Sequence, residues 1–169
     1  AKRQKPDLLI SAGDLTIFEH GLDFILNKLN NFNVKTLLIH GNHETASVMK
    51  KLCKKYSNLI FIHKNYYKHN NNIFLGYGGS GFALAEPEFY KTGENFSKII
   101  RKNKSKKIVF VTHAPPFGTK LDLIVTSHCG NKTFRNFVNK NKINLYICGH
   151  LHENFGKEDR IKKTRIVNP

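Results

Sequence analysis

The sequence predicts an α/β protein, a four-layer α/β/β/α sandwich in which two mixed sheets pack face to face and helices flank them. Apolar runs typical of strands buried on both faces recur at 8–12, 36–40, 108–112 and 145–148. Segments with helical spacing alternate with these runs at both ends of the chain, whereas 66–77 has the pattern of a hairpin. These three observations favour two layers of strands between helices.

The first part of the chain alternates strands and helices. A strand is predicted at 7–12 and a helix at 20–29, where apolar residues recur at helical spacing. After an asparagine-rich loop, a second strand is predicted at 34–40. A helix at 45–56 has apolar residues on one face and lysines on the other, and a short strand follows at 59–63.

The second part begins with the hairpin and a glycine-rich loop at 78–81. No Gly-Lys-Ser/Thr follows this loop, so it is a poor match to a phosphate-binding loop. The remaining elements are two helices, at 94–102 and 131–141, and three strands, at 107–112, 144–148 and 160–167. The chain contains no internal repeat or dividing linker, so 1–169 is interpreted as one domain.

The composition excludes a membrane protein and leaves several partners open. No apolar run is as long as a membrane span, and no signal-peptide pattern opens the chain. Three cysteines without metal-site spacing indicate reduced thiols in a cytoplasmic protein. The net charge of +16 attracts anions, but the lysines are scattered, which favours a compositional bias over a nucleic-acid partner. The composition leaves the oligomeric state open.

Polar side chains follow four of the predicted strands. Asp14, Asn42, His113 and His150 each come directly after a strand or after its terminal glycine. Because sites in open α/β sheets form outside the carboxyl ends of the strands, these side chains are expected to converge. His152 would join them if the segment from His150 is extended, since alternate residues of a strand point to the same side. Carboxylate, amide and imidazole ligands together suit Mn²⁺, Fe²⁺ or Zn²⁺.

The motifs around these residues resemble those of the calcineurin-like metallophosphoesterases. Gly13-Asp14, Gly41-Asn42-His43-Glu44, His113 and Gly149-His150-Leu151-His152 occur in the order found in that family, and the resemblance covers nearly the whole chain. The chain is most similar to small prokaryotic members related to the cyclic-nucleotide phosphodiesterases, which share its His-Ala-Pro-Pro and Gly-His-x-His-Glu motifs. The resemblance implies the metallo-dependent phosphatase fold.

The resemblance also implies an activity. The expected substrate is a phosphomonoester or phosphodiester, with nucleotides among the candidates. The expected nucleophile is a hydroxide that bridges two divalent metal ions. Two close cations lower the pKa of a shared water and stabilise the attacking and leaving oxygens.

Each motif residue receives a role from the same resemblance. Asp14 would bridge the two ions. Asn42, His113 and His150 would complete one metal site, and His152 would bind the other ion. The remaining motif histidine, His43, would be the catalytic residue and would face the phosphate and its leaving group without binding metal.

Two neighbouring residues have alternative interpretations. Glu44 is expected to stabilise the following helix by its charge rather than take part in chemistry. His128 either reaches the site and contacts substrate or has a packing role.

One part of the family pattern is absent. The family opens with an Asp-x-His strand, but no such motif occurs among the thirteen residues before Asp14. A strand and its crossover helix need about 30 residues to return to the sheet. We therefore expect 1–169 to lack the first strand and helix of the domain. One metal site would then have four ligands in this sequence and the other only two.

Three functions are compatible with these patterns. A metal-dependent phosphoesterase uses all six motif residues. A non-catalytic scaffold of the same fold, adapted to protein interaction, has no need for all of them. A nuclease would need a clustered basic groove, which the sequence does not locate. The phosphoesterase is therefore favoured.

Overall fold

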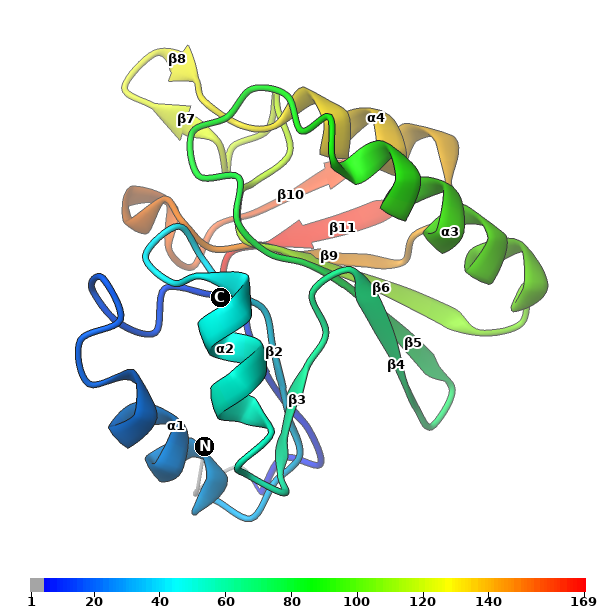
Figure 1. Ribbon diagram of the computed structural model, residues 1–169. Helices are drawn as coiled ribbons and strands as arrows, with labels where there is room; N and C mark the ends of the chain where they lie inside the picture. The colour runs from blue at the N-terminus through cyan, green and yellow to red at the C-terminus, as the bar shows by residue number, and fades with distance from the viewer. Residues whose placement is uncertain (1–4) are drawn as a thin grey trace.

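The computed structural model describes residues 5–169 and has four layers (Figure 1). Helices α1 (Leu22–Asn30) and α2 (Ala46–Cys53) cover one sheet. Helices α3 (Phe89–Lys102) and α4 (Lys132–Lys140) cover the other. The predicted order of helix, sheet, sheet and helix is confirmed. In the described part of the chain, no helix combines the length and apolar character needed to cross a membrane.

The smaller sheet contains three parallel strands in the order β1-β2-β3. They span Leu9–Ser11, Thr36–Leu38 and Leu59–Phe61. Strand β2 lies in the middle and pairs with both neighbours, and α1 and α2 connect successive strands. The carboxyl ends of all three strands therefore lie at one edge.

The larger sheet contains six strands and is mixed. Its order is β10 (Glu158–Ile161), β11 (Thr164–Val167), β9 (Leu145–Ile147), β6 (Lys107–Thr112), β5 (Asn72–Tyr77) and β4 (Asn65–His69). The four inner strands are parallel to one another, whereas the edge strands β10 and β4 are antiparallel to their neighbours. The ends of β6 and β9 therefore lie at the same edge of this sheet.

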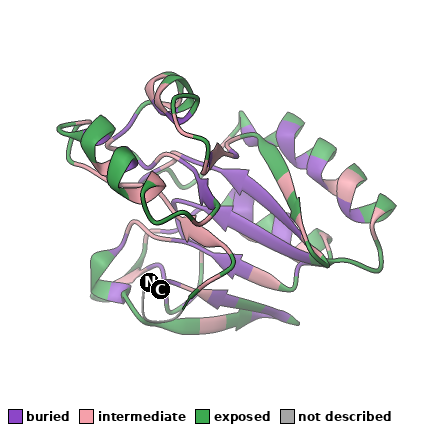
Figure 2. Cartoon of the chain, turned by 90° about the horizontal axis from the view of Figure 1, so that it is seen from below, coloured by how far each residue is buried: buried purple, intermediate pink, exposed green. Residues whose placement is uncertain are grey.

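The inner strands β2, β5, β6 and β9 are largely buried on both faces because each sheet lies between the other sheet and two helices. Leu37 lies in the core between the sheets with Val109, whereas Leu38 lies in the core under α1 and α2 with Met49. Successive strand residues point to opposite faces, so both faces of β2 require apolar side chains. Figure 2 shows this burial along the strands and the exposed outer faces of the helices.

A phenylalanine cluster holds α3 and α4 on the larger sheet. Phe89 of α3 packs edge-on against Phe134 of α4, with ring centroids 5.2 Å apart, and Phe110 of β6 packs in the same way against Phe137 at 5.1 Å. Edge-to-face pairs at these distances add to the stabilisation from burial.

Most boundaries differ from those predicted by up to three residues, and three features differ more. Helix α3 begins at Phe89 rather than at 94 and so includes Gly93, where a Cβ would lie 2.9 Å from the Phe89 ring. The strand predicted at 160–167 is a hairpin of β10 and β11, with Lys162 in the left-handed region at its turn. The hairpin of β7 (Leu123–Ile124) and β8 (Ser127–His128) was not predicted, since two-residue strands have no measurable period.

Candidate metal centre

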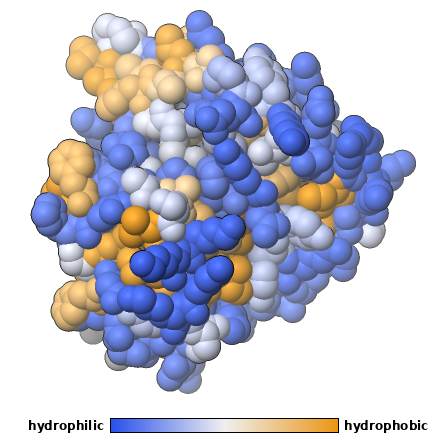
Figure 3. All heavy atoms as spheres, in the orientation of Figure 1, coloured by the Kyte–Doolittle hydropathy of each residue, from blue (hydrophilic) through white to orange (hydrophobic). Residues whose placement is uncertain are grey.

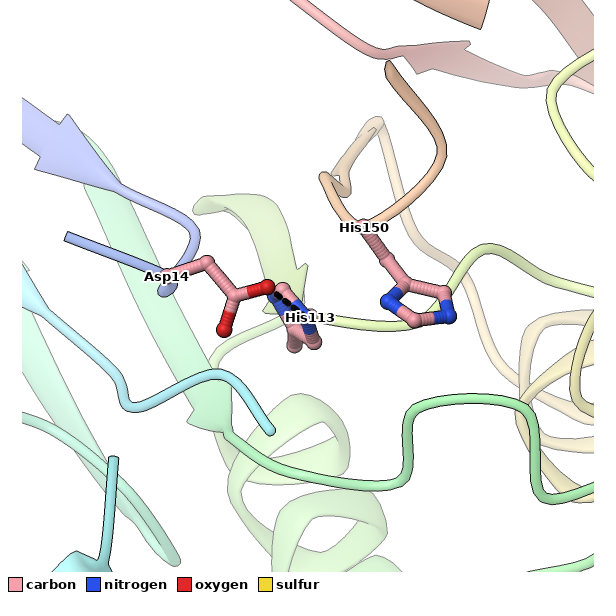
Figure 4. A group of neighbouring side chains, drawn as sticks. All are labelled: Asp14, His113 and His150. Atoms are coloured by element: carbon pink, nitrogen blue, oxygen red, sulfur yellow. Dashed lines mark ion pairs between the residues drawn. The ribbon is translucent and has the colours of Figure 1, made fainter. Parts of the chain in front are cut away.

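The fold brings the ends of four strands together where the edges of the two sheets meet. Asp14 follows β1 and Asn42 follows β2 of the smaller sheet, whereas His113 and His150 follow β6 and β9 of the larger one. Ligand atoms of Asp14, His113 and His150 all lie within 4.8 Å of one another (Figure 4). Asn42 joins them, because its Oδ1 lies 2.9 Å from His113 Nε2.

The hydrogen bonds of His113 are compatible with a cation in this cluster. Its Nδ1 lies 2.8 Å from the carbonyl oxygen of Ala12, which can only accept, so Nδ1 carries the proton. In the neutral ring, Nε2 then directs a lone pair toward Asp14 Oδ2 at 3.2 Å and Asn42 Oδ1 at 2.9 Å. Three electron-rich atoms face one another, and a metal ion would bind all three. An N–H bond to a backbone carbonyl also commonly orients histidines that bind metal.

His150 provides a second observation in favour of a metal. In Figure 4 the ring nitrogen of His150 next to the Cγ atom, Nδ1, is turned toward Asp14 and His113. That nitrogen is placed to bind an ion together with these two residues. Burial, reinforced by the nearby charge of His113, lowers the pKa of His150 to about 4. The ring is therefore neutral near pH 7, which is the form that binds metal.

Asp14 is held as a carboxylate in a tight backbone cradle. Burial opposes its ionisation, but His113 in its protonated form, through a hydrogen bond and its charge, and the backbone N–H of His43 together lower the pKa of Asp14 below its ordinary value. Gly41 packs against this carboxylate: a Cβ there would lie 1.9 Å from Asp14 Oδ1. The preceding Gly13 has φ 93, and a Cβ there would lie 2.4 Å from the Gly41 nitrogen. Only glycine fits either position.

Glu44 positions these loops, a role that the sequence did not reveal. Its side chain is buried, and Oε2 accepts hydrogen bonds from the backbone N–H of Asp14 at 3.0 Å and of Gly41 at 2.9 Å. Oε1 accepts from the backbone N–H of Thr16 at 3.0 Å. Glu44 therefore joins the loop after β1 to the loop after β2, whereas the sequence suggested only a charge effect on α2. Its place beside Asn42 and His43 was the one available signal.

His43 lies beside the cluster. Its backbone N–H donates to Asp14 Oδ1 at 3.1 Å. Its ring packs edge-on against Phe18, with centroids 4.9 Å apart, and Nδ1 is buried without a hydrogen-bond partner in the described chain. The ring nitrogen is thus available to a bound group, and the catalytic role of His43 stays a prediction.

His152 lies outside the group of three ligands that the structure brings together. The extended conformation predicted for this segment is wrong, because His150 has φ 69 and His152 begins the short 3₁₀ helix η1 (His152–Asn154). His152 is exposed, although it lies near enough for its charge to lower the pKa of His150. Its role as a ligand of the other ion stays a prediction.

His128 is held by a carboxylate outside the cluster. It lies on β8, and its Nδ1 is 2.8 Å from Asp122 Oδ1. Asp122 is fully buried and also accepts from the backbone N–H groups of Gly118, Thr119 and Gly130. Asp122 thus organises the loop that presents His128, and no pattern in the sequence indicated this role. A substrate contact by His128 stays a prediction.

Comparison with protein families gives one match that covers most of the chain. The family model described as calcineurin-like phosphoesterase matches residues 1–154. An uncharacterised protein of Methanocaldococcus jannaschii is 34% identical over 173 residues, which cover 96% of this chain and 77% of that protein.

Solved structures share the fold at low sequence identity. One crystal structure matches with a TM-score of 0.82 and 18% identity over 99% of this chain and 81% of its own. The protein TT1561 of Thermus thermophilus matches with a TM-score of 0.75 and 13% identity, over 99% of this chain and 78% of its own. The sulfate thiohydrolase SoxB of Thermus thermophilus matches with a TM-score of 0.56 and 16% identity, over 93% of this chain and 31% of its own.

Proposed function

Since the chain belongs to the calcineurin-like phosphoesterase family, we propose that it hydrolyses a phosphomonoester or phosphodiester with two divalent metal ions held between its two sheets. The observation that carries the proposal is the convergence of Asp14, His113 and His150, with Asn42 in hydrogen-bonding distance of His113. A protein scaffold has no need for a carboxylate and two imidazoles whose ligand atoms converge from three strand ends.

The donor set indicates which ions would bind. Asp14, Asn42, His113 and His150 would hold one ion, and Asp14 with His152 would contribute to the other. One carboxylate, one amide and neutral imidazoles suit Mn²⁺, Fe²⁺ or Zn²⁺. Bound ions would supply Lewis-acid polarisation of the phosphoryl group and activation of water.

The chain's own residues would orient the ester and move its proton. The ring of His43 would face the leaving group and donate a proton to its oxygen, a step that suits an imidazole near neutral pH. The His43 backbone N–H holds Asp14, so the ring and the metal ligand are fixed relative to each other. Glu44 keeps both on loops joined by backbone hydrogen bonds.

The nuclease alternative has no support at the centre. A groove of about 630 Å³ between α3 and α4 is lined by Lys98, Arg101 and Lys140, among other residues. None of its lining residues belongs to the centre, so nucleic acid bound there would not place its phosphates at the ligands. We therefore favour phosphoester hydrolysis at the centre over a nuclease.

The test combines activity with metal content. The protein is assayed with p-nitrophenyl phosphate and bis(p-nitrophenyl) phosphate after loading with Mn²⁺, Fe²⁺ or Zn²⁺, and bound metal is measured by elemental analysis. Asp14→Asn is expected to lose both metal and hydrolysis. Metal binding without hydrolysis of either ester would contradict the proposal and favour the scaffold.

His69→Ala is the matched control. His69 lies on β4 next to the start of β5, where Asn72 pairs with Lys107 at the beginning of β6. The centre follows the other end of β6, after Thr112. His69→Ala is therefore expected to keep metal and activity.

A further inference from the structure

Two exposed phenylalanines lie directly against imidazoles of the candidate centre. Phe18 is 70% exposed, and its ring lies edge-on to His43 with centroids 4.9 Å apart. Phe82 is 63% exposed, and its ring lies edge-on to His150 at 4.3 Å. An isolated exposed phenylalanine is ordinary, but two that each contact a histidine of one site form an apolar border to that site.

The loop that carries Phe18 is fixed in an unusual conformation. Phe18 and Glu19 have φ 50 and φ 64, in the left-handed region that bulky residues rarely adopt. The loop is held on both sides, because Glu44 accepts from the Thr16 N–H and Glu19 accepts from the Thr45 N–H at 2.7 Å. Such strain persists when surrounding contacts enforce it, and it is common at ligand sites. Figure 3 shows apolar atoms at the left edge of this face, where the loop between β1 and α1 lies.

The loop that carries Phe82 is also held. Gly81 packs against Asn42: a Cβ there would lie 3.4 Å from the Asn42 Cβ. On the other side of Phe82, the Ala83 carbonyl accepts from the Asn131 side chain at 2.8 Å, and the Leu84 carbonyl accepts from the Lys132 N–H at 2.7 Å. The N-terminus of α4 thus anchors this loop beside a metal ligand.

We propose that Phe18 and Phe82 bind a planar aromatic group of the phosphoester substrate, an inference that rests on the proposed function. Asp14 lies in the ligand cluster with His150 and accepts from the His43 N–H, so both phenylalanines contact residues around one phosphate position. Exposed Ile17 and Leu84 extend the apolar surface beside each ring. A methyl ester would leave this surface in water, whereas an aryl or heteroaryl ester would cover it.

Phosphonates test this by binding alone, because they are not hydrolysed. Phenylphosphonate, cyclohexylphosphonate and methylphosphonate are titrated into the Mn²⁺-loaded protein by calorimetry. Aromatic stacking predicts that phenylphosphonate binds at least about tenfold more tightly than methylphosphonate. The flat phenyl ring should also bind more tightly than the puckered cyclohexyl ring. The methylenephosphonate analogue of adenosine 5′-monophosphate, which is also not hydrolysed, then separates a nucleobase from a simple aryl group as the ring recognised.

Variants connect the preference to the two side chains. Phe18→Ala and Phe82→Ala should each reduce the preference for phenylphosphonate over methylphosphonate by about fivefold or more. Phe82→Leu should also reduce it, because it keeps an apolar side chain and removes the ring. Phe24→Ala is the matched control, since Phe24 is 61% exposed on α1 beneath the Lys28 ammonium, outside the centre. Thermal melts confirm that each variant is folded.

The outcomes separate this proposal from the proposed function. Equal affinity for the phenyl and methyl compounds, together with phosphoester hydrolysis, would overturn the aromatic subsite and leave the phosphoesterase intact. Failure to bind any phosphonate, together with absence of hydrolysis, would overturn both. A change of sedimentation mass on Phe18→Ala or Phe82→Ala, without a change in ligand preference, would assign the rings to contacts between copies of the chain and overturn the subsite.

Discussion

At the residue scale, the proton on His113 determines what the centre can bind. The Ala12 carbonyl keeps that proton on Nδ1, so Nε2 turns a lone pair toward Asp14 and Asn42. His150 adds a ring that is neutral near pH 7, with a nitrogen turned toward the same position. The affinity of the site for a cation thus depends on a backbone carbonyl that itself binds no metal.

Replacing His43 separates chemistry from metal binding. We expect His43→Ala to lower the kcat for phosphoester hydrolysis by at least about tenfold, because proton transfer by a positioned side chain typically contributes about 10²–10⁴-fold. Metal content should stay nearly unchanged, since the backbone N–H that holds Asp14 remains. Elemental analysis and steady-state kinetics measure both. Loss of metal together with activity would instead identify His43 as a ligand.

His63 predicts how stability depends on pH. Burial, with smaller contributions from His40 and Lys64, lowers the pKa of His63 from 6.5 to about 3. Between these values the unfolded chain binds a proton that the folded chain excludes, so stability falls as the pH decreases from 6.5 toward 3. Urea midpoints of the metal-free protein should therefore be lower at about pH 5 than at about pH 7.5.

His63→Gln isolates this contribution from those of other groups, because Gln does not titrate. The variant should lose less stability between the two pH values than the parent protein, whatever its stability at the higher pH. The same loss in both proteins would show that His63 titrates alike in the folded and unfolded chains.

At the element scale, a single buried carboxylate joins two loops of the smaller sheet. Glu44 accepts backbone hydrogen bonds from Asp14, Thr16 and Gly41. Glu44→Ala would leave these donors without their partner, and each such loss costs about 1–3 kcal/mol. We expect the free energy of unfolding to fall by about 3 kcal/mol or more, measured by urea denaturation.

The matched control is Glu94→Ala, because Glu94 is exposed on α3. It should change stability by no more than about 0.5 kcal/mol. An effect of Glu44→Ala as small as this would mean that water replaces the carboxylate and that the loops do not depend on it.

The sequence predicted the features that depend on local pattern. Runs such as 37–39 are apolar on both faces because two layers cover them, so the strands and the order of the layers could be predicted. The positions of the polar residues at strand ends could also be predicted, because an apolar run stops where the chain leaves the core. The roles of Glu44 and Asp122 could not be predicted. Each carboxylate accepts hydrogen bonds from backbone N–H groups, and no side-chain pattern in the sequence indicates which N–H groups need a partner. The left-handed backbone of His150 was likewise not indicated by any sequence pattern.

At the scale of the whole molecule, the centre joins the two sheets. Asp14 and Asn42 come from the smaller sheet, and His113 and His150 come from the larger one. Protein contacts already connect these edges. His113 Nδ1 donates a hydrogen bond to the Ala12 carbonyl oxygen, and Gly149 lies so close to Ala12 that an added Cβ would be 3.5 Å from the Ala12 side chain. A bound ion would add a link that forms only when both sheets are in place.

Metal binding should therefore raise the thermal stability of the whole domain. A ligand that binds only the folded state adds about 2.7 kcal/mol when its free concentration is 100 times its Kd. For a domain of this size, each kcal/mol raises the Tm by about 2–4 °C, so a shift of about 5–10 °C is expected. Calorimetry with Mn²⁺ or Zn²⁺ measures the shift, and a chelator should reverse it. His150→Ala should reduce it, because one ligand from the larger sheet is lost, whereas His69→Ala should preserve it. An undiminished shift in His150→Ala would place the stabilising ion elsewhere and break the connection between the metal and the two sheets.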